Sequence, residues 1–192
     1  MEPKENRSIQ RTQALLKDGL MALMQQKPIQ KISVKELTDS VNLNRGTFYL
    51  HYKDIYDLME QIETDMLQEF QEINHTHKVS EMGGSPYPLL VDLFHFLKKN
   101  AEFGRILLIE NRDQTFMDKL KNIIRERCLT DWAQMFENTN PELYSFYSSY
   151  VLSGCIGIIE TWLRDGTVQS PEVMAEYTAH VILHGLDTLK KN

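Results

Sequence analysis

The sequence predicts an all-α protein, with a small N-terminal three-helix bundle followed by a larger helical domain. Apolar residues recur about every 3.6 positions over long stretches, and no stretch alternates apolar and polar residues as a half-buried strand does. Turn signals are sparse and gather in a few short segments. With 192 residues, of which 42% are hydrophobic and 25% charged, the chain has the composition and the length to bury a core.

Helix start and stop signals divide the N-terminal quarter. Pro28 closes the first periodic stretch. Ser33 and Glu36 form a capping-box pattern, in which the hydroxyl accepts from the Glu36 amide while the Glu36 carboxylate reaches back. Asn44 and Asp54 suit the N-cap positions of two further helices. The predicted helices are about 8–26, 33–41, 45–51 and 54–73.

The remaining chain is predicted to be a helical body. Residues 75–88 are rich in Gly, Pro and polar residues and form the clearest loop. The helices expected after it are about 88–99, 101–110, 114–137, 141–164 and 171–190. We therefore expect two domains, a small helical one over 1–53 and a larger helical one over 54–192.

Charge is distributed unevenly along the chain. The net charge is −6, which by itself argues against a nucleic-acid partner. Residues 1–53, however, carry nine Lys and Arg against five Asp and Glu, a net +4, and the rest carries a net −10. A basic head on an acidic body is typical of a protein that holds phosphates with one end.

Several protein classes are disfavoured. The N-terminus lacks an apolar signal segment, and the most apolar stretch, 150–163, is too short and too polar for a membrane span. The two cysteines, Cys128 and Cys155, lie far apart without metal spacing. No nucleophile–base set or phosphate-binding glycine loop is present. We therefore expect a cytoplasmic protein that is not an enzyme, with no cofactor, no metal and no membrane partner.

The segment 32–58 has the pattern of a helix-turn-helix. Leu37 and Val41 share the inner face of its first helix, and Leu43 lies in the turn. Phe48 and Tyr52, four residues apart, share the inner face of the second helix. These positions can pack two short helices against the first helix of the chain at a steep angle.

The opposite face of the second helix carries residues suited to DNA. Arg45 can donate two parallel hydrogen bonds to guanine, and Thr47 can contact a thymine methyl group. Gly46 permits close approach of the backbone, and Leu50 is also outward-facing. Phosphate contacts by the neighbouring polar residues would orient the protein. The expected DNA-binding residues are Ser33, Lys35, Asn44, Arg45, Gly46, Thr47, Tyr49, His51 and Lys53.

The run KELTDSVNLNRGTFYLHYKD, residues 35–54, resembles the signature of the TetR family of bacterial regulators. The resemblance covers about 50 N-terminal residues and implies a regulator that binds operator DNA as a homodimer, more often a repressor than an activator. Two positions depart from the family pattern. Asn42 stands where Gly is usual, and Asn tolerates the left-handed backbone. Ile55 stands where many members have a phosphate-binding Lys. Lys53 is the nearby residue that can make this phosphate contact instead.

The same resemblance assigns roles to the body, although each of these residues also fits a plain hydrophobic core. An unknown effector would bind in a pocket lined by Phe94, Phe103, Met117, Trp132 and Phe136. The last two long helices would form the dimer interface through Tyr147, Val151, Ile158, Trp162, Val181 and Leu186. The alternative function is that of a coregulator with the same fold, controlled by a protein partner instead of a small molecule.

Overall fold

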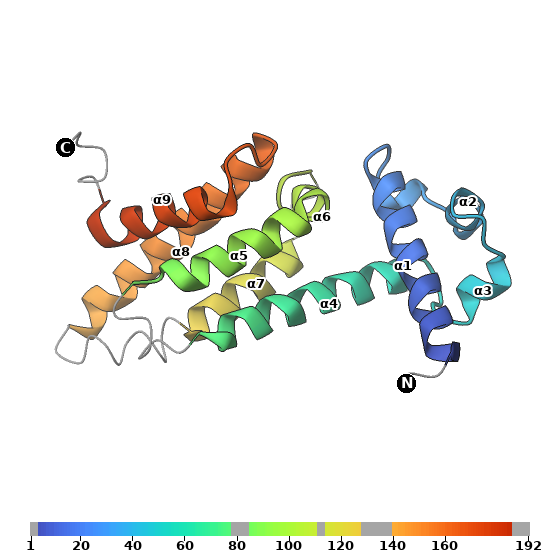
Figure 1. Ribbon diagram of the computed structural model, residues 1–192, viewed down its shortest axis with the longest axis horizontal. Coiled ribbons are helices and arrows are strands. Elements are labelled where there is room, and N and C mark those ends of the chain that lie inside the picture. The colour runs from blue at the N-terminus through green and yellow to red at the C-terminus, as the bar shows by residue number, and fades with distance from the viewer. Residues whose placement is uncertain (1–3, 78–84, 111–113, 128–139, 186–192) are drawn as a thin grey trace. The chain divides into compact units, whose positions relative to one another are not determined.

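The computed structural model describes residues 4–77, 85–110, 114–127 and 140–185. These residues form helices and connecting turns, and no strand occurs among them, which confirms the all-α prediction (Figure 1). Two compact units are present, Met1–Met66 (the N-terminal unit) and Leu67–Asn192 (the C-terminal unit). Within the described ranges, no helix has both the length and the apolar character needed to cross a bilayer.

The helices of the N-terminal unit begin where the sequence signals place them. Ser33 Oγ accepts from the Glu36 amide at 3.2 Å, and Asn44 Oδ1 accepts from the Gly46 amide at 2.8 Å. Asp54 Oδ1 accepts from two amides of the next helix, which makes it the N-cap there. The elements are α1 (Lys4–Met24), η1 (Ile29–Lys31), α2 (Val34–Ser40), α3 (Arg45–Tyr49) and α4 (Ile55–Thr76), the last of which continues into the C-terminal unit.

The Glu36 side chain does not take the place that the expected capping box gives it. The Glu36 carboxylate forms an ion pair with Lys27, nine residues earlier, and this pair ties the segment after α1 to α2. A charged partner offers a carboxylate a stronger hydrogen bond than a neutral backbone amide does. The Ser33 half of the box is present, and the Glu36 side chain serves a tertiary contact.

Close packing of short helices holds the helix-turn-helix together. Leu37 and Phe48 are fully buried, as the sequence predicts. α1 approaches α2 at Gly19, where an added Cβ would lie 2.4 Å from Val41 Cγ1. The turn between α2 and α3 contains Asn42 with φ of 53°, the left-handed conformation that Asn tolerates. Figure 1 shows α2 and α3 beside α1 in this unit.

The C-terminal unit contains the remaining helices. Asn140 and Ser170 accept hydrogen bonds from the first turns of its last two helices, each of which starts with Pro. The expected helix over 101–110 is α-helical only to Arg105 and then continues as a π-helical turn. The elements are α5 (Tyr87–Lys99), α6 (Ala101–Arg105), η3 (Ile106–Glu110), α7 (Gln114–Arg127), α8 (Pro141–Arg164) and α9 (Pro171–His184). The distal part of the expected 114–137 helix lies outside the described residues.

Large aromatic side chains form the core of the C-terminal unit. The Trp162 ring of α8 meets the Phe94 ring of α5 edge to face, with centroids 5.2 Å apart. Phe103 and Phe116 meet in the same manner at 6.4 Å. α5 also lies along α9, as Figure 1 shows. Aromatic burial on this scale dominates the stability of such a core.

Candidate nucleic-acid interface

The candidate recognition helix is α3, and its sequence determines which of its faces is buried and which is exposed. Phe48 and Tyr52 are buried, so the intervening and preceding positions face outward. The exposed fractions of Tyr49 and Leu50 are 58% and 80%. Large exposed side chains on so short a helix mark a surface available for a partner.

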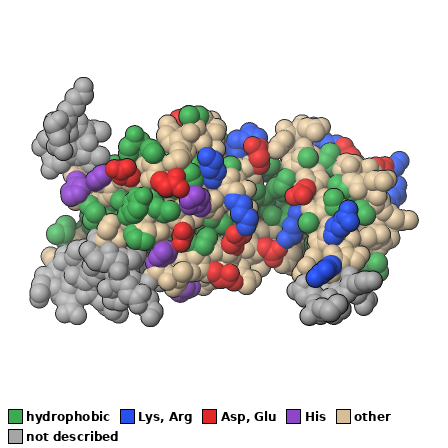
Figure 2. Space-filling view, in the orientation of Figure 1, with side chains coloured by type: hydrophobic (Ala, Val, Ile, Leu, Met, Phe, Trp, Pro, Cys, Tyr) green, Lys and Arg blue, Asp and Glu red, His purple; other side chains and the backbone are tan. Residues whose placement is uncertain are grey.

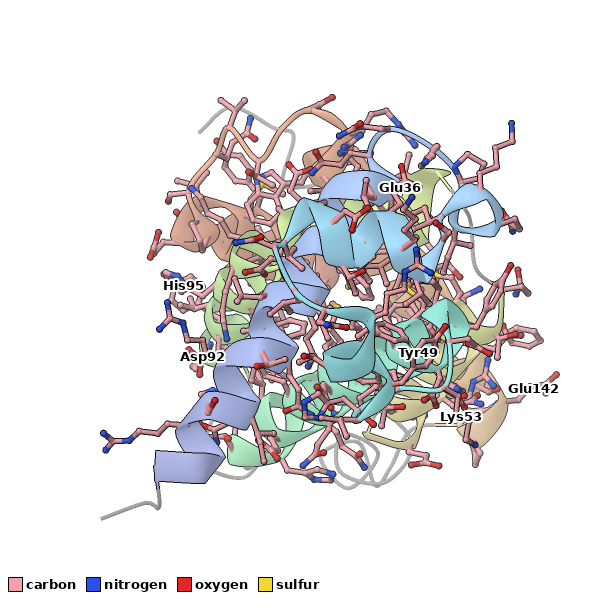
Figure 3. All side chains as sticks on the ribbon, turned by 90° about the vertical axis from the view of Figure 1, so that its right-hand side faces the viewer. Glu36, Tyr49, Lys53, Asp92, His95 and Glu142 are labelled. Carbon is pink, nitrogen blue, oxygen red and sulfur yellow. The ribbon has the colours of Figure 1, made fainter. Side chains whose placement is uncertain are left out.

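The structure places most of the expected DNA-binding residues at the surface. Thr47 and His51 are half-buried. Figure 3 shows Tyr49 and Lys53 at the same edge of the N-terminal unit, whereas Glu36 lies apart from them. The exposed members of the set are Ser33, Lys35, Asn44, Arg45, Gly46, Tyr49 and Lys53.

Two of these residues already serve as helix caps. Ser33 Oγ and Asn44 Oδ1 each accept an amide hydrogen bond, so only the Ser33 hydroxyl proton and the Asn44 side-chain amide remain as donors to DNA. The Gly46 and Thr47 amides are also used, by the side chain and the carbonyl of Asn44. These two amides at the start of α3 are therefore not free to bind a phosphate, and side chains must make the contacts.

Several cations of the N-terminal unit, on this surface and elsewhere, have no ion pair among the described residues. Lys17 and Lys27 form ion pairs with Asp65 and Glu36. Lys35, Arg45 and Lys53, by contrast, form no ion pair in the described part of the chain. Figure 2 shows Lys and Arg side chains spread over the surface of the N-terminal unit. Cations without carboxylate partners can neutralise phosphates at no cost in broken ion pairs.

The start of α4 differs from the TetR pattern in a definite way. Ile55 is buried, so the position that carries Lys in many members contributes to the core here. The next residue, Tyr56, is exposed and adds a hydroxyl to the same region. Sequence analysis missed Tyr56, although the apolar spacing of Ile55, Leu58 and Met59 already implied that residue 56 faces outward.

Three of the five residues expected to line an effector pocket lie in the core. Phe94, Phe103 and Met117 are all buried, and the two Phe rings pack against Trp162 and Phe116. Trp132 and Phe136 lie outside the described residues. A pocket at this place stays a prediction.

The residues expected at the dimer interface divide into four groups. Tyr147 is exposed, and its hydroxyl donates to the Ile182 carbonyl of α9 at 2.7 Å. Trp162 is only 2% exposed, so it belongs to the core of its own chain and offers almost no surface to a second copy. Its indole nitrogen donates to the Gln169 carbonyl. The half-buried residues are Val151, Ile158 and Val181. Leu186 lies outside the described residues.

Sequence analysis missed the most exposed apolar residues of α8. The exposed fractions are 62% for Leu143, 68% for Phe146 and 63% for Tyr150. With Tyr147 they recur at helical spacing, and we call these four residues the α8 stripe. One turn further along, Gly154 has open space where a Cβ would lie. It borders a groove of about 410 Å³ between α8 and α9.

Comparison with known proteins gives relatives in both sequence and structure. Residues 84–184, more than half of the chain, match the TetR family described as "Transcriptional regulator C-terminal region". The HTH-type transcriptional regulator YxbF of Bacillus subtilis (strain 168) is 24% identical over 171 residues, which are 85% of this chain and 43% of that protein. The chain therefore spans less than half the length of this curated relative.

Solved structures share the fold at low sequence identity. The dihydroxyacetone kinase operon activator DhaS is 18% identical with a TM-score of 0.62, covering 92% of this chain and 96% of its own. The regulator FadR of Bacillus subtilis, in complex with stearoyl-CoA, is 14% identical with a TM-score of 0.67, covering 90% and 98%. By its family match and its fold, this chain belongs to the TetR family of transcriptional regulators.

Proposed function

We propose that the protein is a sequence-specific DNA-binding regulator that uses α3 as its recognition helix. The observation that carries the proposal is the outward face of α3, where Arg45, Tyr49 and Leu50 are exposed beside unpaired lysines. Arg45 can read guanine in the major groove with two hydrogen bonds, and Leu50 can contact a thymine methyl group. Lys35 and Lys53 would hold phosphates and fix the register of the helix.

Arg45→Ala and Lys53→Ala test this assignment together. Arg45→Ala is expected to cost roughly 1–3 kcal/mol on the cognate operator and to relax preference at one base position. Lys53→Ala should weaken binding to all sequences alike and reduce the slope of affinity against salt by about 1. Binding is measured by gel shift at several salt concentrations, with the exposed Arg125→Ala on α7 as the control. If all three variants bound the operator with the same affinity and the same salt dependence, α3 would not be the helix that reads DNA.

We further propose that the regulator acts as a homodimer held by α8 and α9. The α8 stripe presents three side chains that are more than half exposed, and Gly154 lets a second helix approach closely. One five-residue recognition helix reads few bases, so two copies one helical turn apart supply useful specificity. Phe146→Glu should convert the dimer to a monomer in sedimentation experiments, whereas Glu176→Gln, at an acidic residue of α9, should leave it unchanged. If the Phe146→Glu variant remained a dimer, the dimer interface would lie elsewhere on the protein.

Control by a small effector is the third part of the proposal. FadR, which has the same fold, is described with stearoyl-CoA bound, so such a body can hold an apolar ligand. Phe94, Phe103 and Met117 supply an aromatic and thioether surface suited to an apolar chain. An effector that binds one conformation of the body better than the other would release a repressor from DNA.

The effector test compares operator affinity with and without ligand. Long-chain acyl-CoA, titrated into a protein–operator mixture, should lower operator affinity, and the parallel titration with coenzyme A alone should not. Binding of the acyl-CoA without any change in operator affinity would contradict the proposal. If a protein partner controls the regulator instead, purified protein will bind its operator identically with every small molecule.

A further inference from the structure

A polar cavity of about 350 Å³ opens within the N-terminal unit, away from the outward face of α3. One wall of the cavity comes from α1 and another from α4. His51 and Tyr52, which follow α3, close one end. Its lining is almost wholly polar, unlike the apolar lining of most small-molecule sites. The residues that line the cavity are Gln13, Lys17, His51, Tyr52, Asp57, Gln61 and Asp65.

The buried member of this cavity is Tyr52. Its side chain is packed against Phe48, with ring centroids 5.7 Å apart, and the residue is only 5% exposed. Its hydroxyl has no hydrogen bond of good geometry among the described protein atoms, and only the Gln13 side chain, which also lines the cavity, lies near enough to lower its pKa as a weak partner would. A buried hydroxyl left without a partner costs about 1–3 kcal/mol, so buried polar groups almost always have one. The Tyr52 hydroxyl is therefore available to accept a hydrogen bond from a molecule bound in the cavity.

Burial and nearby carboxylates keep this hydroxyl protonated. Burial raises the pKa of Tyr52, and the negative charges of Asp65 and Asp57 raise it further, with a smaller opposing effect from Gln13. The hydroxyl thus lies in the field of two carboxylates. Its oxygen can accept a hydrogen bond from a donor that also interacts with those carboxylates.

The two carboxylates are not equally satisfied. Asp65 pairs with Lys17 and accepts a hydrogen bond of 2.7 Å from Gln61. Asp57 accepts only from the Lys53 backbone amide, at 2.8 Å, and forms no ion pair in the described part of the chain. The lining therefore has two carboxylates for one ammonium group, and the uncompensated charge lies at Asp57.

We propose that this cavity is a binding site for a small aliphatic amine in its protonated form. The ammonium group of the ligand would pair with the Asp57 carboxylate and donate to the Tyr52 hydroxyl. Ordered water can satisfy the hydroxyl but leaves the charge of Asp57 uncompensated, and an anion would be repelled. The volume lies at the lower end of that of ligand sites, which suits a compact molecule.

A bound amine would have one consequence that rests on the proposed function. His51 lines the cavity and is also an expected phosphate contact. A ligand that draws the imidazole into the cavity removes it from the DNA side. Amine and operator would then oppose each other inside the DNA-binding unit itself, independently of the C-terminal unit.

The test titrates the full-length protein, without DNA, with putrescine and with butanediol of the same chain length, at constant ionic strength. Amide chemical shifts in NMR spectra report the binding. Putrescine should shift the signals of Tyr52 and Asp57 saturably, and butanediol should not. Tyr52→Phe and Asp57→Asn should each weaken putrescine binding at least tenfold, whereas Asp18→Asn, which removes an exposed carboxylate of the same unit outside the cavity, should not.

Three results would overturn the proposal: no saturable shift, an equal response to butanediol, or an equal loss of affinity in Asp18→Asn. The first would mean that water alone fills the cavity. Tyr52→Phe retains the ring and its packing, and its melting temperature is measured to verify folding. Because no DNA is present, failure of this test is distinguishable from failure of operator binding.

Discussion

The N-terminal unit holds its helices together by close backbone approach, whereas the C-terminal unit does so by burying large aromatic rings. In the first, Gly19 lets α1 lie directly against Val41, the residue that follows α2. In the second, Trp162 and Phe94 fill the space between α8 and α5. The difference determines which side chains of each unit stay at the surface. The small unit leaves the outer face of α3 available, while the larger unit buries rings such as Trp162 and Phe94 and exposes those of the α8 stripe.

Trp162→Ala should have the largest effect, because it removes the largest buried side chain among the described residues of the C-terminal unit. Loss of a buried Trp costs about 3–5 kcal/mol of unfolding free energy. Urea denaturation followed by circular dichroism measures the loss. Val168→Ala, at a strongly exposed neighbouring residue, should change little. A small effect of Trp162→Ala would mean that the core does not depend on this ring.

Gly19→Val should have the next largest effect, in the N-terminal unit. The added side chain meets Val41 and Leu37, so α1 and α2 must separate. Overpacking of this kind costs about 1–3 kcal/mol. Ala14→Val on the exposed face of α1 is the matched control for the lower helix propensity of Val. If both variants lose the same stability, close approach at Gly19 is not what holds the unit together.

Asn44→Ala should have a smaller effect, because it removes only the side-chain cap of α3. The loss of an N-cap costs typically about 1 kcal/mol. Asn44→Asp keeps an acceptor for the Gly46 amide and should retain most of the stability. Thermal unfolding separates the two variants, and identical melting temperatures would show that the α3 cap is not needed.

Lys17→Met should have the smallest effect, and it should depend on pH. Burial alone would raise the pKa of Asp65, but hydrogen bonds from Lys17 and Gln61 and the charge of Lys17 hold it below its ordinary value. Because the folded pKa is lowered, the stabilisation is present at neutral pH and is lost as pH falls through that pKa. For a partly exposed pair this amounts to less than about 1 kcal/mol. Wild type and Lys17→Met should therefore differ at pH 7 and converge in acid, and a constant difference would exclude the ion pair as its cause.

Local sequence predicted the features that depend on a few neighbouring residues. Ser33, Asn44 and Asp54 cap their helices as expected, because a cap and the amides it binds lie within three positions. The carboxylate of Glu36 could not be predicted in the same way. Its partner Lys27 comes near only after α1 and α2 pack together.

The assignment of helix faces was the harder problem. Periodic spacing shows that Trp162 and Tyr147 both belong to apolar positions of α8, but it does not say whether such a face meets its own chain or another. The structure buries Trp162 and exposes the α8 stripe. The cavity at Tyr52 was likewise beyond sequence reasoning, since its lining comes from three segments that only the fold brings together.

If the α8 stripe forms the proposed dimer interface, operator occupancy depends on protein concentration. A surface that is covered only when two chains meet gives the dimer a stability that rises with the amount of protein, by mass action. Occupancy of a paired operator site by such dimers then varies with the square of monomer concentration when monomers predominate. A cell that holds few copies would leave its operator empty, and a modest rise in expression would fill it. The exposed rings of α8 would thus set the expression level at which regulation begins.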